Sequence, residues 1–202
     1  MDAQTDILKR GLEHAALAVM DASALANLHL GPKRIGRGLA QRVSGRLRIL
    51  ETIVRRLILL MALGLQLAPT PPRPAPANPD LPEGVELAIF PRLSPRRLKL
   101  LPARQAFEGP GGFPDISGTS YGPVSPHKLM ARIAALRRVI AAPEAHASRL
   151  ARTLNRLQKN GEPKPMVGAA TPAFRLSPEL GALAAMLPAQ ISAGLETWES
   201  SG

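Results

Sequence analysis

The sequence contains no cysteine among its 202 residues. This absence excludes disulfide bonds, thiolate nucleophiles, iron–sulfur clusters and zinc sites built on cysteine. A chain without cysteine is typical of a reducing compartment. The first ten residues carry Asp2 and Asp6 and have no apolar core, so they do not resemble a secretory signal. We therefore expect a cytoplasmic protein.

Aromatic residues are scarce, with one tryptophan, one tyrosine and four phenylalanines. Because strands favour aromatic and β-branched residues, this composition argues against a β-sandwich or barrel and favours a leucine-based helical core. Prolines and glycines number 21 and 17, about a fifth of the chain, which is typical of helices joined by irregular segments. The expected fold is mainly α, with an N-terminal and a C-terminal helical pair joined by a long Pro/Gly-rich, largely irregular segment.

The sequence also lacks the common catalytic motifs, including the nucleophile elbow, the phosphate loop and the HExxH zinc motif. Its four histidines, His14, His29, His127 and His146, do not have the spacing of metal ligands. We therefore expect a protein that is not an enzyme and binds no metal or cofactor.

Residues 1–68 are predicted to form the N-terminal helical region. Apolar residues recur at helical spacing over residues 5–28 and again over residues 35–67. Glycines weaken the first turns of the second stretch, so we expect its firm helix to begin near Val43. Its stripe falls in one narrow sector of the helix and consists of Leu39, Val43, Leu47, Leu50, Val54, Leu57 and Met61.

Residues 69–124 form the predicted connection. Seven prolines between residues 68 and 84 forbid a helix and favour an extended linker. The sequence VELAIF at 85–90 is the one short strand expected. Its end is set by Pro91, because proline cannot continue a strand in a sheet. The stretch 91–104 contains five basic residues and no acid.

Residues 125–160 are predicted to form a basic helical pair. Ser125-Pro126 marks its start and Asn160-Gly161 its end. The heptad spacing of apolar residues continues through Pro143, so one long kinked helix is possible. A residue before proline avoids helical geometry, however, and we therefore favour two helices with a corner at Pro143. Residues 161–202 are expected to be a tail with a short helix at 178–187, ended by Pro188.

The two long stripes are each too narrow to be stable alone. We expect them to pack on each other, within one chain or across a homodimer. The predicted packing or partner face comprises Leu47, Leu50, Val54, Leu57, Met61, Leu129, Ile133, Leu136, Ile140, Leu150, Leu154 and Leu157.

The formal net charge is +11 and the isoelectric point is near 11.3, which favours polyanionic partners such as nucleic acid or an acidic protein. Residues 33–56 and 128–159 each contain eight basic residues and one acid. An alternative explanation of the positive charge is codon bias in a GC-rich genome, since arginine outnumbers lysine by 20 to 6. The residues predicted to bind a polyanion are Arg42, Arg46, Arg55, Arg149, Arg152 and Arg156.

Base-stacking platforms need aromatic residues among the basic ones, and no aromatic residue precedes Phe90. The preferred function is therefore binding of a nucleic-acid backbone without sequence readout. A helix-turn-helix within 125–160 stays open, although its connection lacks the usual glycine.

Two alternatives use apolar surfaces instead of charge. The leucine-rich helices could dock a partner protein. The apolar run 57–67, beside Arg55 and Arg56, could lie on an anionic membrane surface. A spanning helix is not expected, because the 12 residues 57–68 extend about 18 Å as a helix, against about 30 Å of hydrocarbon.

Two segments, VRRLILLMALGLQLAPTPPRP at 54–74 and APEAHASRLARTL at 142–154, resemble segments of uncharacterised Ala/Arg/Pro-rich proteins from GC-rich bacteria. The resemblance is one of composition and covers less than a fifth of the chain. It implies a bacterial source and implies no activity and no functional residue.

Overall fold

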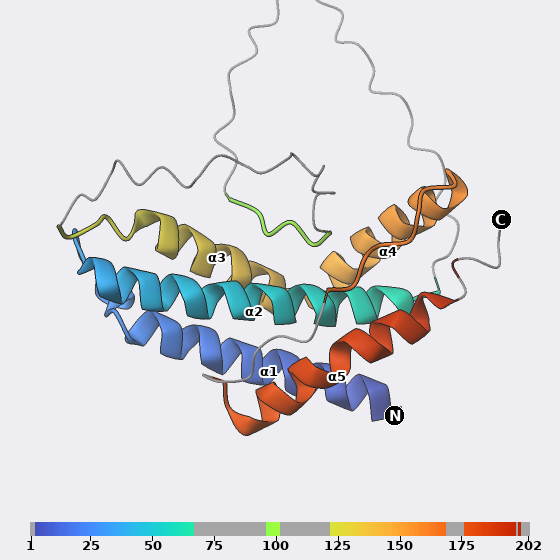
Figure 1. The fold of residues 1–202 in the computed structure, drawn as a ribbon, viewed down its shortest axis with the longest axis horizontal. Helices are drawn as coiled ribbons and strands as arrows, with labels where there is room; N and C mark the ends of the chain where they lie inside the picture. The colour runs from blue at the N-terminus through green and yellow to red at the C-terminus, as the bar shows by residue number, and fades with distance from the viewer. Residues whose placement is uncertain (1–2, 67–95, 102–121, 169–175, 197, 199–202) are drawn as a thin grey trace, which may run out of the picture.

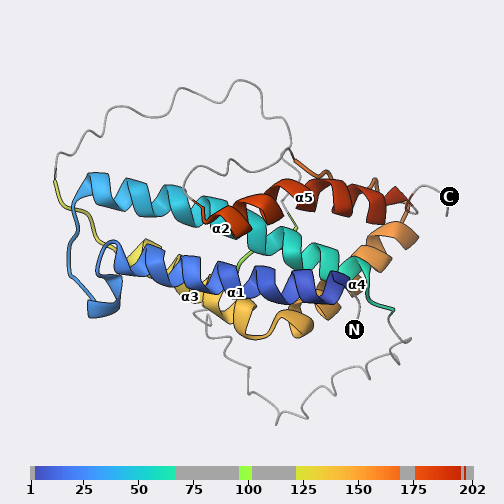
Figure 2. The same cartoon turned by 90° about the horizontal axis from the view of Figure 1, so that it is seen from below.

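A computed structural model describes residues 3–66, 96–101, 122–168, 176–196 and 198. Within these residues the protein is a helical bundle built around one long central helix, α2, with α3 and α4 above it and α1 and α5 below it in the view of Figure 1. Seen from below, α1 and α5 lie side by side along α2 (Figure 2). The helices are α1 (Ala3–Ala24), the 3₁₀ turn η1 (Leu28–Leu30), α2 (Arg37–Leu63), α3 (His127–Ala141), α4 (Pro143–Lys159) and α5 (Pro178–Gly194).

The core surrounds α2, because helices pack on it from several directions. The stripe residues Leu47, Leu50 and Leu57 are fully buried, and so are Ile53 and Ile58, which lie on either side of the stripe. The second half of α2 is therefore covered well beyond the single sector that the periodicity predicts. The mainly α fold class is confirmed, and both predicted stripes pack within one chain.

Both N-terminal helices differ in extent from the prediction. Helix α1 ends at Ala24, before the expected Leu28. The chain turns just after this end, and Asn27 adopts a left-handed φ of 48°. Helix α2 begins at Arg37 and not near Val43, with the Ala40 amide already donating to the Gly36 carbonyl over 2.9 Å. The early glycines cost about 1 kcal/mol each, which propagation from the firmly packed part of the helix offsets.

The C-terminal pair turns at the expected corner. Helix α3 ends at Ala141, Ala142 leaves helical geometry with φ −139° and ψ 59°, and α4 begins at Pro143. Its end is a glycine stop: Gly161 has φ 67°, and the Glu162 amide donates to the Leu157 carbonyl over 3.0 Å. This pair of features is the Schellman arrangement, which satisfies the last carbonyls of α4.

The predicted short helix 178–187 is wrong in length, because α5 continues through Pro188 to Gly194. Proline inside a helix removes one backbone hydrogen bond and costs about 3 kcal/mol. Burial of Leu187 and Ile191 on the same face offsets that loss, since both side chains are almost completely buried in the core.

Most of the predicted connection 69–124, including the expected strand 85–90, lies outside the described residues. Near its end, Val124 forms an isolated antiparallel bridge with Ile35, with two hydrogen bonds of 2.8 and 2.9 Å. The start of α3 is thereby tied to the start of α2.

The central position of α2 generates a test of the fold. Val54 is fully buried, so Val54→Asp places a charge in the core, and we expect loss of helicity and of the cooperative thermal transition by circular dichroism. The matched control is Gln41→Asp, an exposed position on the same helix with the same change in charge. An unchanged melting curve for Val54→Asp would refute the packing.

Candidate polyanion interface

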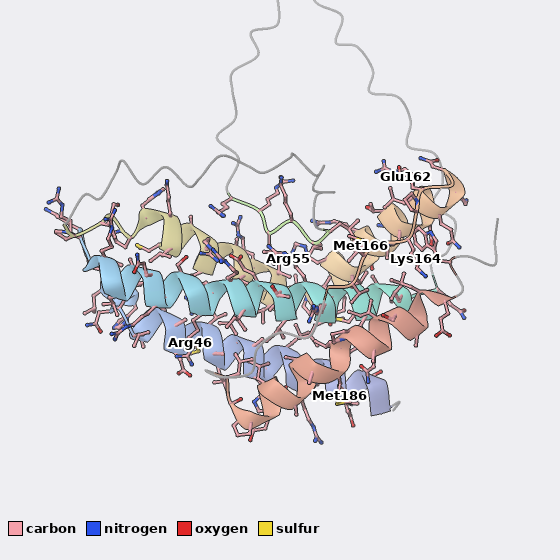
Figure 3. The ribbon with its side chains drawn as sticks, in the orientation of Figure 1. Arg46, Arg55, Glu162, Lys164, Met166 and Met186 are labelled. Carbon is pink, nitrogen blue, oxygen red and sulfur yellow. The ribbon has the colours of Figure 1, made fainter. Side chains whose placement is uncertain are left out.

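The six arginines predicted to bind a polyanion are divided by the central helix. Figure 3 shows Arg46 on the α1 side of α2 and Arg55 on the side of α3 and α4. Arg42, one helical turn before Arg46, is exposed. The other three, Arg149, Arg152 and Arg156, are on α4. The structure therefore does not bring the six together into one surface.

Arg46 is engaged within the bundle. Its guanidinium lies 3.5 Å from the carboxylate of Asp21 on α1. Its Nε atom is buried and has no hydrogen-bond partner among the described residues. This side chain joins α2 to α1, so its charge is already matched by an acid.

Arg55 belongs to an ion-pair network centred on Glu51, a largely buried acid of α2. Glu51 Oε1 accepts a hydrogen bond of 2.7 Å from Arg132 Nε on α3, and Oε2 lies 3.7 Å from Arg55 Nη2. Arg132 Nη1 also donates to Ser44 Oγ over 2.9 Å. Burial lowers the pKa of Arg55, while Glu51 raises it and Arg132 lowers it. The carboxylate of Glu51 therefore joins α2 to α3 through Arg132, and Arg55 of its own helix lies beside the same carboxylate.

Two arginines hold the backbone of the basic segment 96–101. Arg55 Nε donates to the Lys99 carbonyl over 2.7 Å, and Arg138 Nη2 on α3 donates to the Arg96 carbonyl. The leucines of the segment pack against the core, and its basic side chains are exposed. The partly buried leucines and the two backbone hydrogen bonds hold the segment in place, so Arg96, Arg97 and Lys99 face solvent beside α3.

The arginine row of α4 lies on the surface. Arg149, Arg152 and Arg156 follow each other at spacings of three and four, so they share one side of the helix. All three are exposed, and none of their guanidinium groups forms an ion pair or hydrogen bond within the part of the chain that the structure describes.

These elements together form what we call the basic face, defined as the exposed lysines and arginines of α3, α4 and segment 96–101. Helices α3 and α4 carry eight basic residues and one acid, whereas α1 and α5 carry two basic residues and four acids. The pair of helices on one side of α2 is therefore more positive than the pair on the other side. Figure 3 shows the side chains of both sides. The members of the basic face are Arg96, Arg97, Lys99, Lys128, Arg137, Arg138, Arg149, Arg152, Arg156 and Lys159.

The prediction of individual binding residues omitted Arg96, Arg97, Lys99 and Arg138. The signal for the first three was the acid-free stretch 91–104. Their importance depends on the contacts of Arg55 and Arg138 with the segment backbone, which no local pattern shows.

The predicted apolar face lies inside the protein. Of its twelve residues, Met61 and Ile140 are partly buried and pack against the core, Leu157 is partly buried, and the others are buried in the core. The run 57–63 contributes Leu57, Ile58 and Leu60 to that core, so most of its apolar surface is turned away from solvent.

Among the described residues, no helix is both long and apolar enough to cross a membrane, and no group of three or more acids and histidines is placed to hold a metal ion. An open apolar hollow of about 450 Å³ lies where the ends of α1, α2 and α5 meet. Its described lining includes Ile7, Leu60, Leu63, Gln190 and Ala193.

His146 is the histidine of the basic face, one turn before Arg149 on α4. Burial lowers its pKa below the ordinary value of 6.5, and the positive charges of Arg149 and Arg138 lower it further. Burial and the two nearby positive charges therefore both disfavour the protonated imidazole.

Comparison with known proteins gives no further guide. A scan of protein-family models, a search of curated proteins and a search of solved structures each found no significant match to this chain.

The Glu51 network generates a stability prediction. Glu51→Ala leaves Arg55 and Arg132 uncompensated in a partly buried place, so we expect the free energy of unfolding to fall by about 2–4 kcal/mol in urea denaturation. Glu144→Ala, which removes an exposed acid of α4, should change it by less than about 0.5 kcal/mol. Equal effects of the two substitutions would contradict the role assigned to Glu51.

The lowered pKa of His146 generates a pH prediction. Below 6.5 the unfolded chain takes up a proton that the folded protein resists, so the folded state loses stability as the pH falls. We expect wild type to lose more stability between about pH 7 and about pH 5 than His146→Gln does, measured by chemical denaturation. His29→Gln, at an exposed histidine, is the control and should follow wild type. Parallel curves for wild type and His146→Gln would rule out the shift.

Proposed function

We propose that this protein binds the phosphate backbone of nucleic acid through the basic face, without reading sequence. The observation that carries the proposal is the anchoring of segment 96–101 by Arg55 and Arg138. Through these two hydrogen bonds the fold fixes a second set of cations beside the helices that carry the first. A surface with many cations and few acids attracts a polyanion by Coulomb forces and by release of its counterions.

The spacing of the arginine row suits a line of phosphates. From Arg149 to Arg156 the helix rises about 10.5 Å, and successive phosphates of one DNA strand are about 3.4 Å apart along the duplex axis. Each guanidinium can donate two parallel hydrogen bonds to one phosphate. The row therefore offers three phosphate contacts along one groove edge, with the cations of α3 and segment 96–101 beside it.

The described side chains on this face favour contact with the phosphate backbone over stacking on bases. Base stacking requires aromatic platforms. Among the described residues Trp198 is the aromatic side chain, and its indole N–H donates to the Glu162 carbonyl over 3.1 Å. The basic face itself has charged groups and no such platform in its described part.

The two alternative functions receive less support. Docking of a partner through the leucine stripes, or of a membrane through residues 57–67, needs apolar surface that the bundle uses mainly for its own core. Binding to an acidic protein uses the same cations as nucleic acid and is an outcome of the experiment that follows.

The test is fluorescence anisotropy of a labelled DNA duplex titrated with wild type and with the double variant Arg152→Gln/Arg156→Gln at several salt concentrations. Each lost phosphate contact lowers the slope of log K against log salt by about one, so we expect a slope smaller by about two and binding weakened roughly tenfold near physiological salt. Scrambling the duplex sequence should leave the affinity unchanged.

The matched control is Lys9→Gln/Arg10→Gln, which removes two exposed cations of α1 on the other side of α2. It has the same net charge as the test variant and should keep the wild-type slope. Equal losses in both variants would mean that net charge alone matters. If wild type does not bind the duplex even at low salt, the proposed function is wrong and an acidic protein becomes the partner to search for.

A further inference from the structure

The corner between α3 and α4 brings together three nitrogen-bearing side chains. Arg138 lies in the last turn of α3, and His146 and Arg149 lie in the first two turns of α4. The break at Ala142 turns the chain between the two helices, and Arg149 follows His146 by three residues on the same side of α4. The positive charges of Arg149 and Arg138 both lower the pKa of the imidazole. His146 is partly buried, whereas Arg138 and Arg149 are exposed.

Arg138 is held in place before any ligand binds. Its Nε donates to the Ala134 carbonyl over 3.2 Å and its Nη2 to the Arg96 carbonyl. A guanidinium has five N–H groups, so three remain for a ligand. Because its carbonyl partners are neutral, the positive charge of Arg138 is not cancelled. A cation fixed by its own protein loses little conformational entropy when it binds an anion.

The charge around His146 is positive. Glu144, the acid of this corner, is exposed and precedes His146 by two residues, about 200° around the helix, so it points elsewhere. Helix α2 contributes the pair Glu51 and Arg55, whose charges offset each other. The remaining charged groups of α3, α4 and segment 96–101 are all basic. They are Lys128, Arg132 and Arg137 on α3, Arg152, Arg156 and Lys159 on α4, and Arg96, Arg97 and Lys99 on the segment.

We propose that Arg138, His146 and Arg149 form a binding site for a single phosphate oxyanion, and that its affinity rises as the pH falls and His146 takes up a proton. The proposal rests on the proposed function in taking nucleic-acid phosphate as the source of the anion. A bound dianion or monoanion offsets the repulsion between the two guanidinium groups and the imidazolium. The protonated imidazole then donates a charge-assisted hydrogen bond to the anion.

The first experiment follows the four imidazole groups of the whole protein by NMR during pH titrations with and without inorganic sulfate, which does not itself titrate in this range. We expect sulfate to raise the pKa of His146 and to move His127, an exposed histidine at the start of α3, much less. In Arg138→Gln/Arg149→Gln the pKa of His146 should be higher without anion, and sulfate should no longer move it. Equal movement of His127 and His146 in wild type, or none, would overturn the site.

The second experiment measures duplex DNA binding by anisotropy at about pH 8 and about pH 5.5 in constant salt. We expect wild type to gain on the order of tenfold in affinity at the lower pH, a change equivalent to about 1.4 kcal/mol. His146→Gln should lose most of that gain, whereas His127→Gln should behave as wild type. An equal gain in His146→Gln and wild type would overturn the site and leave the proposed function intact.

Vesicles of phosphatidylcholine and phosphatidylserine, tested by flotation at the same two pH values, separate the two sources of phosphate. DNA binding that depends on His146, with vesicle binding that does not, supports a nucleic-acid phosphate. The reverse result, vesicle binding that depends on His146 and DNA binding that does not, would overturn nucleic acid as the source of the phosphate at this site and leave the proposed function of the basic face intact.

Discussion

The bundle and its basic face both depend on one buried carboxylate. Glu51 binds Arg132 of α3 and lies within ion-pair distance of Arg55 of its own helix. Without it, two guanidinium groups would lie close together in a place largely closed to water, where repulsion and lost hydration both oppose folding. With it, Arg55 is positioned to donate to the Lys99 carbonyl, and the basic segment 96–101 is fixed beside α3. The buried carboxylate of Glu51 therefore helps to position the exposed cations of segment 96–101.

The core shows why the helical architecture could be predicted and its details could not. The leucine periodicity of α2 and of α3 with α4 indicated two packed stripes, because helical spacing is a local property of the sequence. The coverage of Ile53 and Ile58 depends on where α1 and α5 lie, which no local pattern contains. The same reason explains α5. Pro188 is a strong local stop signal, and the burial of Leu187 and Ile191 in the common core outweighs it.

The binding surface was predictable in kind and only partly in its residues. The arginine row of α4 follows directly from its spacing, since residues three and four apart share one side of a helix. Arg46 and Arg55 lie in equally basic stretches, but each has an acidic partner, Asp21 from another helix and Glu51 one turn away. In each run of eight basic residues the sequence shows a single acid. Glu51 and Glu144 cannot be told apart by composition, and burial separates them: the first organises a network and the second is solvated.

The distribution of charge bears on whether the arginine excess reflects function or codon bias. Codon bias raises the arginine content of every surface segment alike and supplies no reason for one side of a bundle to differ from the other. Here α3 and α4 carry eight basic residues to one acid, whereas α1 and α5 carry two to four. Like charges gathered on one face repel each other and destabilise the folded state. Such a face therefore carries a standing electrostatic cost in the isolated protein, and the proposed binding of a polyanion would offset it.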